Sequence, residues 1–135
     1  MSLTPYFSII TSIHEFTPFF EGMIFSLNRQ TFKNCELILI LDSPSQQDLP
    51  NIMNVKAKLD PAINCTIHQN SERLGLTKSL NIALAKANGQ VFVRIDCDDE
   101  MVDERLTILK QHYDEGCIFV GNGTEVVAAG VAKSV

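Results

Sequence analysis

The chain has 135 residues, of which 45% are hydrophobic and 20% are charged, and its formal net charge is −5 at pH 7. This composition is typical of a folded globular protein, and the length suits a single domain over residues 1–135. The acidic balance argues against a nucleic-acid partner, which needs a basic face. The apolar runs are no longer than strands and the N-terminus has no secretory pattern, so we expect a cytoplasmic protein.

Four cysteines, at positions 35, 65, 97 and 117, fit no zinc-ligand spacing. Most of them fall in or beside apolar, strand-like segments. We therefore expect buried, reduced thiols, with one or two disulfides as the alternative.

Strand-like and helix-like segments alternate along the chain. Short apolar runs predict buried strands at residues 6–13, 36–42, 63–69, 90–96 and 117–121. Apolar residues at helical spacing predict helices that begin at Pro18 after a Thr17 cap, span about 48–59, run from Leu76 to an αL stop at Asn88-Gly89, and span about 102–115. This order predicts an α/β fold with an open, mostly parallel sheet and helices on both faces.

Ligands of such sheets bind beyond the carboxyl ends of the strands, an edge called the rim below. The first predicted strand ends in Ser12, Ile13, His14 and Glu15, the second ends in Asp42, and the fourth runs into several carboxylates. Three strand ends are therefore expected to place oxygen atoms along one edge. The rim is the candidate site.

The segment RIDCDDE, residues 94–100, places four carboxylates in five positions. Residues two apart in an extended segment point to the same side, so Asp96 and Asp98 are expected to face one point. Carboxylates this close repel each other unless one is protonated or a cation lies between them, and oxygen ligands suit Mg²⁺ or Mn²⁺. The alternative is a solvated turn in which Asp98 or Asp99 caps the next helix.

Together these segments resemble the N-terminal half of a family 2 glycosyltransferase with the GT-A fold. The resemblance rests on four stretches in order: FSIITSIHE, SLNRQTFKNCELILILDSPS, RLGLTKSLNIALAKANGQVFVRIDCDDE, and ERL. The third contains the D-x-D motif, Asp96 and Asp98. No G-x-G-x-x-G or P-loop signature of other nucleotide-binding classes is present.

The resemblance implies roles for individual residues. Thr11 would contact the nucleoside, and Asp42 would accept the N–H of a base, typically uracil. Asp96 would lie near the ribose and the metal, and Asp98 would ligate the ion that bridges the diphosphate. Ile13 stands where some members have an aromatic residue, so it would pack against the base without stacking on it.

Other residues at these positions have weaker assignments. Glu15 is a candidate nucleotide-sugar contact because it lies at the predicted rim, and Arg73 is a candidate diphosphate contact, with a solvated surface charge as its alternative. Asp42 could instead cap the turn at residues 43–45. Asp99 and Glu100 are expected to be acids at the start of the next helix.

The family also implies an activity: inverting, metal-dependent transfer of a sugar, with a UDP-sugar favoured, to a saccharide or lipid-linked acceptor in polysaccharide biosynthesis. The parent enzyme would then work at the cytoplasmic face of the membrane. The general base of family members lies beyond the D-x-D strand, so we expect this chain alone to be inactive. The alternative is a nucleotide-binding or assembly module, and an exposed sheet edge would favour a homodimer.

Overall fold

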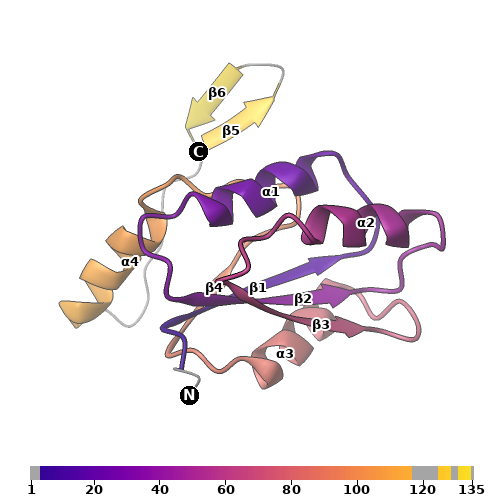
Figure 1. Ribbon diagram of the computed structural model, residues 1–135, viewed down its shortest axis with the longest axis horizontal. Helices are drawn as coiled ribbons and strands as arrows, with labels where there is room; N and C mark the ends of the chain where they lie inside the picture. Colours follow the sequence, from indigo (N-terminus) through magenta and orange to yellow (C-terminus); the bar gives the residue numbers. More distant parts are fainter. Residues whose placement is uncertain (1–3, 117–124, 129–130, 135) are drawn as a thin grey trace.

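The computed structural model describes residues 4–116, 125–128 and 131–134. Within them, strands and helices alternate (Figure 1): β1 (Phe7–Ile13), α1 (Phe19–Asn28), β2 (Cys35–Leu41), α2 (Asp48–Lys56), β3 (Asn64–Gln69), α3 (Leu76–Lys86), β4 (Val91–Arg94) and α4 (Arg105–Asp114). Two further strands, β5 (Glu125–Ala128) and β6 (Val131–Ser134), pair antiparallel in a separate sheet. The predicted strand at 117–121 lies outside the described residues.

The main sheet is parallel, with the strand order β3-β2-β1-β4. Its central strand β2 is buried at all seven positions, whereas the edge strand β4 has only one buried residue, Val93. The predicted α/β fold with an open parallel sheet is therefore confirmed. Because all four strands run the same way, their carboxyl ends share one edge, and this edge is the rim.

Helices cover both faces of the sheet (Figure 1): α1 and α2 lie on one face and α3 on the other. The larger core lies on the α1 side, where Phe20, Ile24 and Leu27 of α1 are fully buried. This is the spacing that an amphipathic helix needs to cover a sheet. On the other face, α3 buries Ala83 against isoleucines 10, 38 and 40.

The α3–β4 connection differs from its prediction. Asn88-Gly89 was expected to provide an αL stop, but Gly89 does not have a positive φ, so this expectation is wrong. A Cβ on Gly89 would lie 2.6 Å from Ser8 Oγ and 2.7 Å from Ser8 N, so a side chain has no room there. The Gly89 N–H donates to Ser8 Oγ, and the Asn88 N–H donates to the buried carboxylate of Glu36. Close backbone approach, not helix termination, requires this glycine.

Two other boundaries shift. Helix α1 begins at Phe19, with Pro18 at the N-cap position and the Thr17 hydroxyl accepting the Phe19 N–H at 3.3 Å. Strand β4 ends at Arg94, and α4 begins only at Arg105, three residues later than expected. Among the described residues, no helix has both the length and the apolar character to cross a membrane.

Candidate functional site

The three strand ends at the rim are joined by hydrogen bonds. The Thr11 hydroxyl of β1 donates to the Ile95 carbonyl beyond β4, and the Ile95 N–H donates to the Ile10 carbonyl. On the other side of β1, His14 Nδ1 lies 2.6 Å from the Asp42 carbonyl oxygen, which can only accept, so this nitrogen carries the proton. The segments that carry the candidate residues are thus tied to one another.

Residues 96–99, called the acidic turn below, form a turn in which the Asp99 N–H donates to the Asp96 carbonyl at 3.1 Å. The expectation that Asp96 and Asp98 lie on an extended strand is therefore wrong. The expected closeness of their carboxylates is nevertheless observed. Carboxylate oxygens of Asp96, Asp98 and Asp99 all lie within 4.8 Å of one another. The turn adds Asp99 to the pair, because it folds back where a strand would continue outward.

The acidic turn concentrates negative charge. Asp99 is exposed, but partial loss of water around its carboxyl and then the charges of Asp96 and Asp98 raise its pKa, against the weaker opposing effect of nearby arginines. Arg94 lies 3.1 Å from Asp96, but this pair is half exposed and is screened by solvent. The negative charge of these three carboxylates is only partly neutralised by the nearby arginines. Such a group fits a hard divalent cation, which takes oxygen ligands.

The alternative interpretation of these residues, as caps or first-turn acids of the following helix, is wrong. Helix α4 has Glu104 at its N-cap position, no side-chain cap and no acidic residue in its first turn. Asp99 instead belongs to the acidic turn, and Glu100 lies 3.5 Å from Arg29, the residue directly after α1. The carboxylates therefore gain no stabilisation from the dipole of α4.

Asp42 is 3% exposed, and its carboxylate accepts several hydrogen bonds. Oδ1 accepts from Asn70 Nδ2 at 3.0 Å and from the Leu74 N–H at 2.8 Å, while Oδ2 accepts from the Gly75 N–H at 3.0 Å. Burial raises the pKa of Asp42, but these hydrogen bonds and His14 outweigh it, and the pKa lies below its usual value. Asp42 thus holds the 70–75 loop, not the turn at 43–45.

The loop that Asp42 holds leads directly into α3. Gly75 precedes the helix with φ of 89°, a conformation that glycine adopts without steric cost. Because the Asp42 carboxylate binds backbone N–H groups at this helix start, its charge is also stabilised by the helix dipole. Ser43, directly after Asp42, has a positive φ of 52°, so the chain turns sharply at this strand end.

The other predicted contact residues lie in different environments. Thr11 and Ile13 are buried, with 0% and 1% exposure, while Glu15 and Arg73 are exposed. Direct contact of any of them with a nucleotide stays a prediction. A hollow of about 500 Å³ lies near Cys35 and Asn64, at the amino ends of β2 and β3, and so on the edge opposite the rim.

Two features of the site were missed from the sequence. Arg105 lies near Asp99, and its Nε is buried without a hydrogen-bond partner among the described residues. Burial lowers the pKa of Arg105, and Asp99 opposes this shift. Ser26 of α1 and Gln30, two residues after the end of α1, are buried polar side chains in the stretch SLNRQT. The signal available in the sequence was a pair of polar residues four apart, of which Ser26 lies on the apolar face of the predicted helix.

Residues 8–129 match the family described as glycosyl transferase family 2. The chain belongs to this family. The match covers all of the rim segments described above, from β1 through the acidic turn. The family resemblance noted in the sequence is therefore confirmed.

Two relatives illustrate the relationship. An uncharacterized glycosyltransferase of Haemophilus influenzae is 33% identical over 99 residues, which are 73% of this chain and 30% of the relative. The amylovoran biosynthesis glycosyltransferase AmsE of Erwinia amylovora is 29% identical over 128 residues, which are 93% of this chain and 44% of the relative. This chain thus spans less than half the length of these curated relatives.

Solved structures share the fold. Staphylococcus aureus TarS 1-349 in complex with UDP-GlcNAc matches with a TM-score of 0.71 and 24% identity, over 82% of this chain and 31% of that chain. The mannosyltransferase PcManGT from Pyrobaculum calidifontis, in complex with GDP-Man and Mn²⁺, matches with a TM-score of 0.63 and 20% identity, over 73% of this chain and 29% of that chain. These likenesses confirm the GT-A type of fold.

Proposed function

We propose that this chain is the nucleotide-sugar-binding part of a metal-dependent, inverting glycosyltransferase. The observation that carries the proposal is the convergence of the carboxylates of Asp96, Asp98 and Asp99 within 4.8 Å. They lie beyond the carboxyl end of β4, the edge at which parallel α/β sheets bind ligands. Family membership supports a glycosyl-transfer reaction over another use of such a cluster.

Asp96 and Asp98 would hold Mg²⁺ or Mn²⁺, with Asp99 adding negative charge beside them. When bound, the ion supplies positive charge that stabilises the nucleoside diphosphate as it leaves the sugar. Two of the chain's own residues hold backbone segments in place at the rim. Thr11 fixes the backbone at Ile95, directly before the acidic turn, and Asp42 fixes the 70–75 loop. Arg73, exposed in that loop, is the candidate for a diphosphate contact.

We favour UDP as the nucleotide because Asp42 stands where family members read uracil. Among the described residues, its Oδ2 accepts one hydrogen bond, from Gly75, and a carboxylate oxygen has capacity for a second. One structural neighbour holds UDP-GlcNAc and the other GDP-Man, so the fold alone does not choose the base. The name of the AmsE relative, an amylovoran biosynthesis glycosyltransferase, supports a biosynthetic role, which we take to be polysaccharide biosynthesis. A saccharide or lipid-linked acceptor and work at the cytoplasmic membrane face are proposed from the family resemblance alone.

The proposal predicts Mn²⁺-dependent binding of UDP. Calorimetric titration of UDP in Mn²⁺ should give an affinity at least about tenfold higher than in EDTA, a difference of about 1.4 kcal/mol. UMP is the matched control, because it lacks the β-phosphate and should gain less from Mn²⁺. Equal UDP affinities in Mn²⁺ and EDTA would contradict the ion site. Tighter binding of GDP than of UDP would contradict the role of Asp42.

A further inference from the structure

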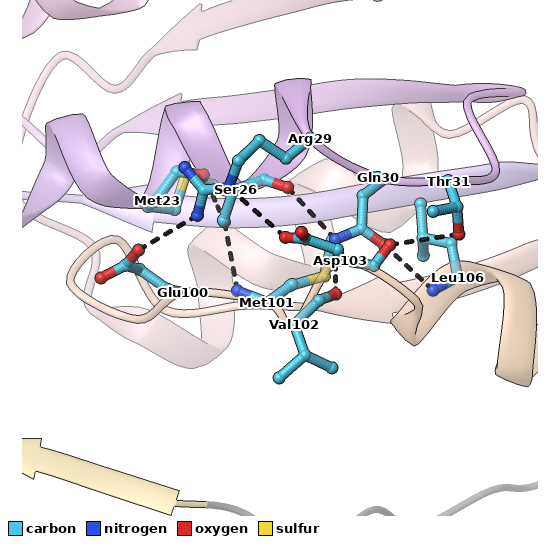
Figure 2. Close-up of polar contacts among 10 residues, drawn as sticks. All are labelled: Met23, Ser26, Arg29, Gln30, Thr31, Glu100, Met101, Val102, Asp103 and Leu106. Atoms are coloured by element: carbon cyan, nitrogen blue, oxygen red, sulfur yellow. Dashed lines mark hydrogen bonds and ion pairs between the residues drawn. The ribbon is translucent and has the colours of Figure 1, made fainter. Parts of the chain in front are cut away.

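We propose that Ser26 of α1 and Gln30, two residues after the end of α1, are positioning residues for the acidic turn, which they hold through the segment that follows it. This inference goes beyond the proposed function, and its consequence for metal binding rests on that function. Figure 2 shows the side chains of Ser26, on α1, and Gln30, just after it, pointing toward residues 101–106, a segment distant in sequence.

Both polar atoms of the Gln30 side-chain amide make hydrogen bonds to backbone groups. The residue is 1% exposed. Its Nε2 donates to the carbonyls of Ser26, at 3.1 Å, and Val102, at 2.7 Å, and its Oε1 accepts the Leu106 N–H at 3.1 Å. A buried side chain with every polar atom paired fixes the backbone groups that it binds, because any displacement leaves a buried donor or acceptor unsatisfied.

Ser26 adds the contact nearest to the acidic turn. Its hydroxyl is fully buried, donates to the Met23 carbonyl at 2.7 Å and accepts the Met101 N–H at 3.1 Å. At the end of α1, the Thr31 N–H donates to the Asp103 carbonyl at 2.9 Å. Backbone groups of 101–103 are therefore engaged by Ser26 of α1 and by Gln30 and Thr31 just after it, which explains why α4 starts only at Arg105.

The acidic turn thus lies between two anchors. Before it, Ile95 is bound by Ile10 and Thr11; after it, Met101 is bound by Ser26. Asp96, Asp98 and Asp99 themselves are exposed. Their carboxylates repel each other, so an unanchored segment would let them move apart. The anchors keep the carboxylates together without a ligand, so less ordering is needed when an ion binds.

The exposed ion pairs beside this network do not serve as the anchor. Arg29 lies 3.3 Å from Asp103 and 3.5 Å from Glu100, but these side chains are about half exposed. Such pairs contribute little because water screens them. The buried neutral groups of Ser26 and Gln30 therefore hold the segment.

Two variants test the proposal against a matched control. Gln30→Met keeps the length of the side chain and removes its hydrogen bonds, and Ser26→Ala removes the hydroxyl. The control is Asn28→Ala, at the last residue of α1 and between the two test positions, since the Asn28 amide also makes two side-chain bonds to backbone. These go to the Lys58 carbonyl at 2.9 Å and the Asp60 N–H at 2.8 Å, far along the chain from the acidic turn.

The first measurement is hydrogen exchange of backbone amides by NMR in the metal-free protein. The Asp99 amide should exchange roughly tenfold faster in Gln30→Met and several-fold faster in Ser26→Ala, because the anchored turn opens locally. Asn28→Ala should leave Asp99 at the wild-type rate. The buried Leu39 amide of β2 reports global unfolding and should remain the slower of the two. Faster exchange at Leu106 with a wild-type rate at Asp99 would overturn the proposal.

The second measurement is Mn²⁺ affinity in the presence of UDP, which should fall several-fold in both variants and not in Asn28→Ala. A wild-type chain that binds no Mn²⁺, combined with faster Asp99 exchange in the variants, would refute the proposed metal function and leave the positioning role intact. Normal Mn²⁺ binding by all variants, with an unchanged Asp99 rate, would refute the positioning role alone.

Discussion

Asp98→Asn is expected to lose Mn²⁺-dependent UDP binding while its ligand-free form unfolds at or slightly above the wild-type temperature. Asp98 is exposed and its charge raises the pKa of Asp99, so its removal relieves repulsion within the acidic turn. A surface change of this kind should alter stability by no more than about 0.5 kcal/mol. Loss of a proposed metal ligand should remove most of the coupling between ion and nucleotide.

Thermal melts with and without Mn²⁺ and UDP separate the two effects. At a ligand concentration about a hundredfold above Kd, the wild type should gain about 2.7 kcal/mol, a rise of roughly 5–10 °C for a domain of this size. Asp98→Asn should show almost no ligand shift. Glu104→Gln is the control, because it removes an exposed carboxylate outside the acidic turn and should keep the full shift. A lower ligand-free melting temperature together with the full shift in Asp98→Asn would contradict a metal site.

Asp42→Ala is expected to destabilise the chain by about 3 kcal/mol or more, because it leaves the Leu74 and Gly75 N–H groups without their charged acceptor. UDP binding should weaken by roughly 1.5–3 kcal/mol, the range for a hydrogen bond to a charged group. Urea unfolding and calorimetry measure the two losses. A variant with wild-type stability would mean that the loop does not depend on Asp42.

The depressed pKa of Asp42 makes this contribution dependent on pH. Because the folded-state pKa lies below the unfolded value, the stabilisation is complete above the unfolded value and is lost as the pH falls toward the folded one. The stability gap between wild type and Asp42→Asn should therefore be wider at about pH 6 than at about pH 3. A gap that is constant across this range would show that the pKa is not depressed.

The main elements could be predicted because their signals are local. Runs such as CELILIL in β2 are fully buried, and apolar residues at helical spacing mark α1 and α3. The position of Asp42 at a strand end followed from the same patterns, since the rim is a consequence of parallel topology. The strand and helix signals need only neighbours within one segment, and the general rule for parallel sheets supplies the rest.

The features that were missed or wrong depend on partners far along the chain. The 70–75 loop binds Asp42 across about 30 residues, and α4 starts late because Gln30 and Ser26 take up backbone groups more than 70 residues away. Gly89 is required by the proximity of Ser8, which its own neighbours do not reveal. No periodicity encodes such contacts, because they arise only when the sheet has assembled.

The ion site itself can be tested by electron paramagnetic resonance of Mn²⁺, whose free-ion signal falls as protein binds it. At a UDP concentration that by itself leaves most of the Mn²⁺ free, the wild-type chain should lower the free-ion signal until about one Mn²⁺ is bound per protein molecule, as expected for an ion shared by carboxylates and phosphates. The double variant Asp96→Asn/Asp98→Asn should give the signal of UDP alone. If the wild type also gave the signal of UDP alone, the acidic turn would not be a metal site.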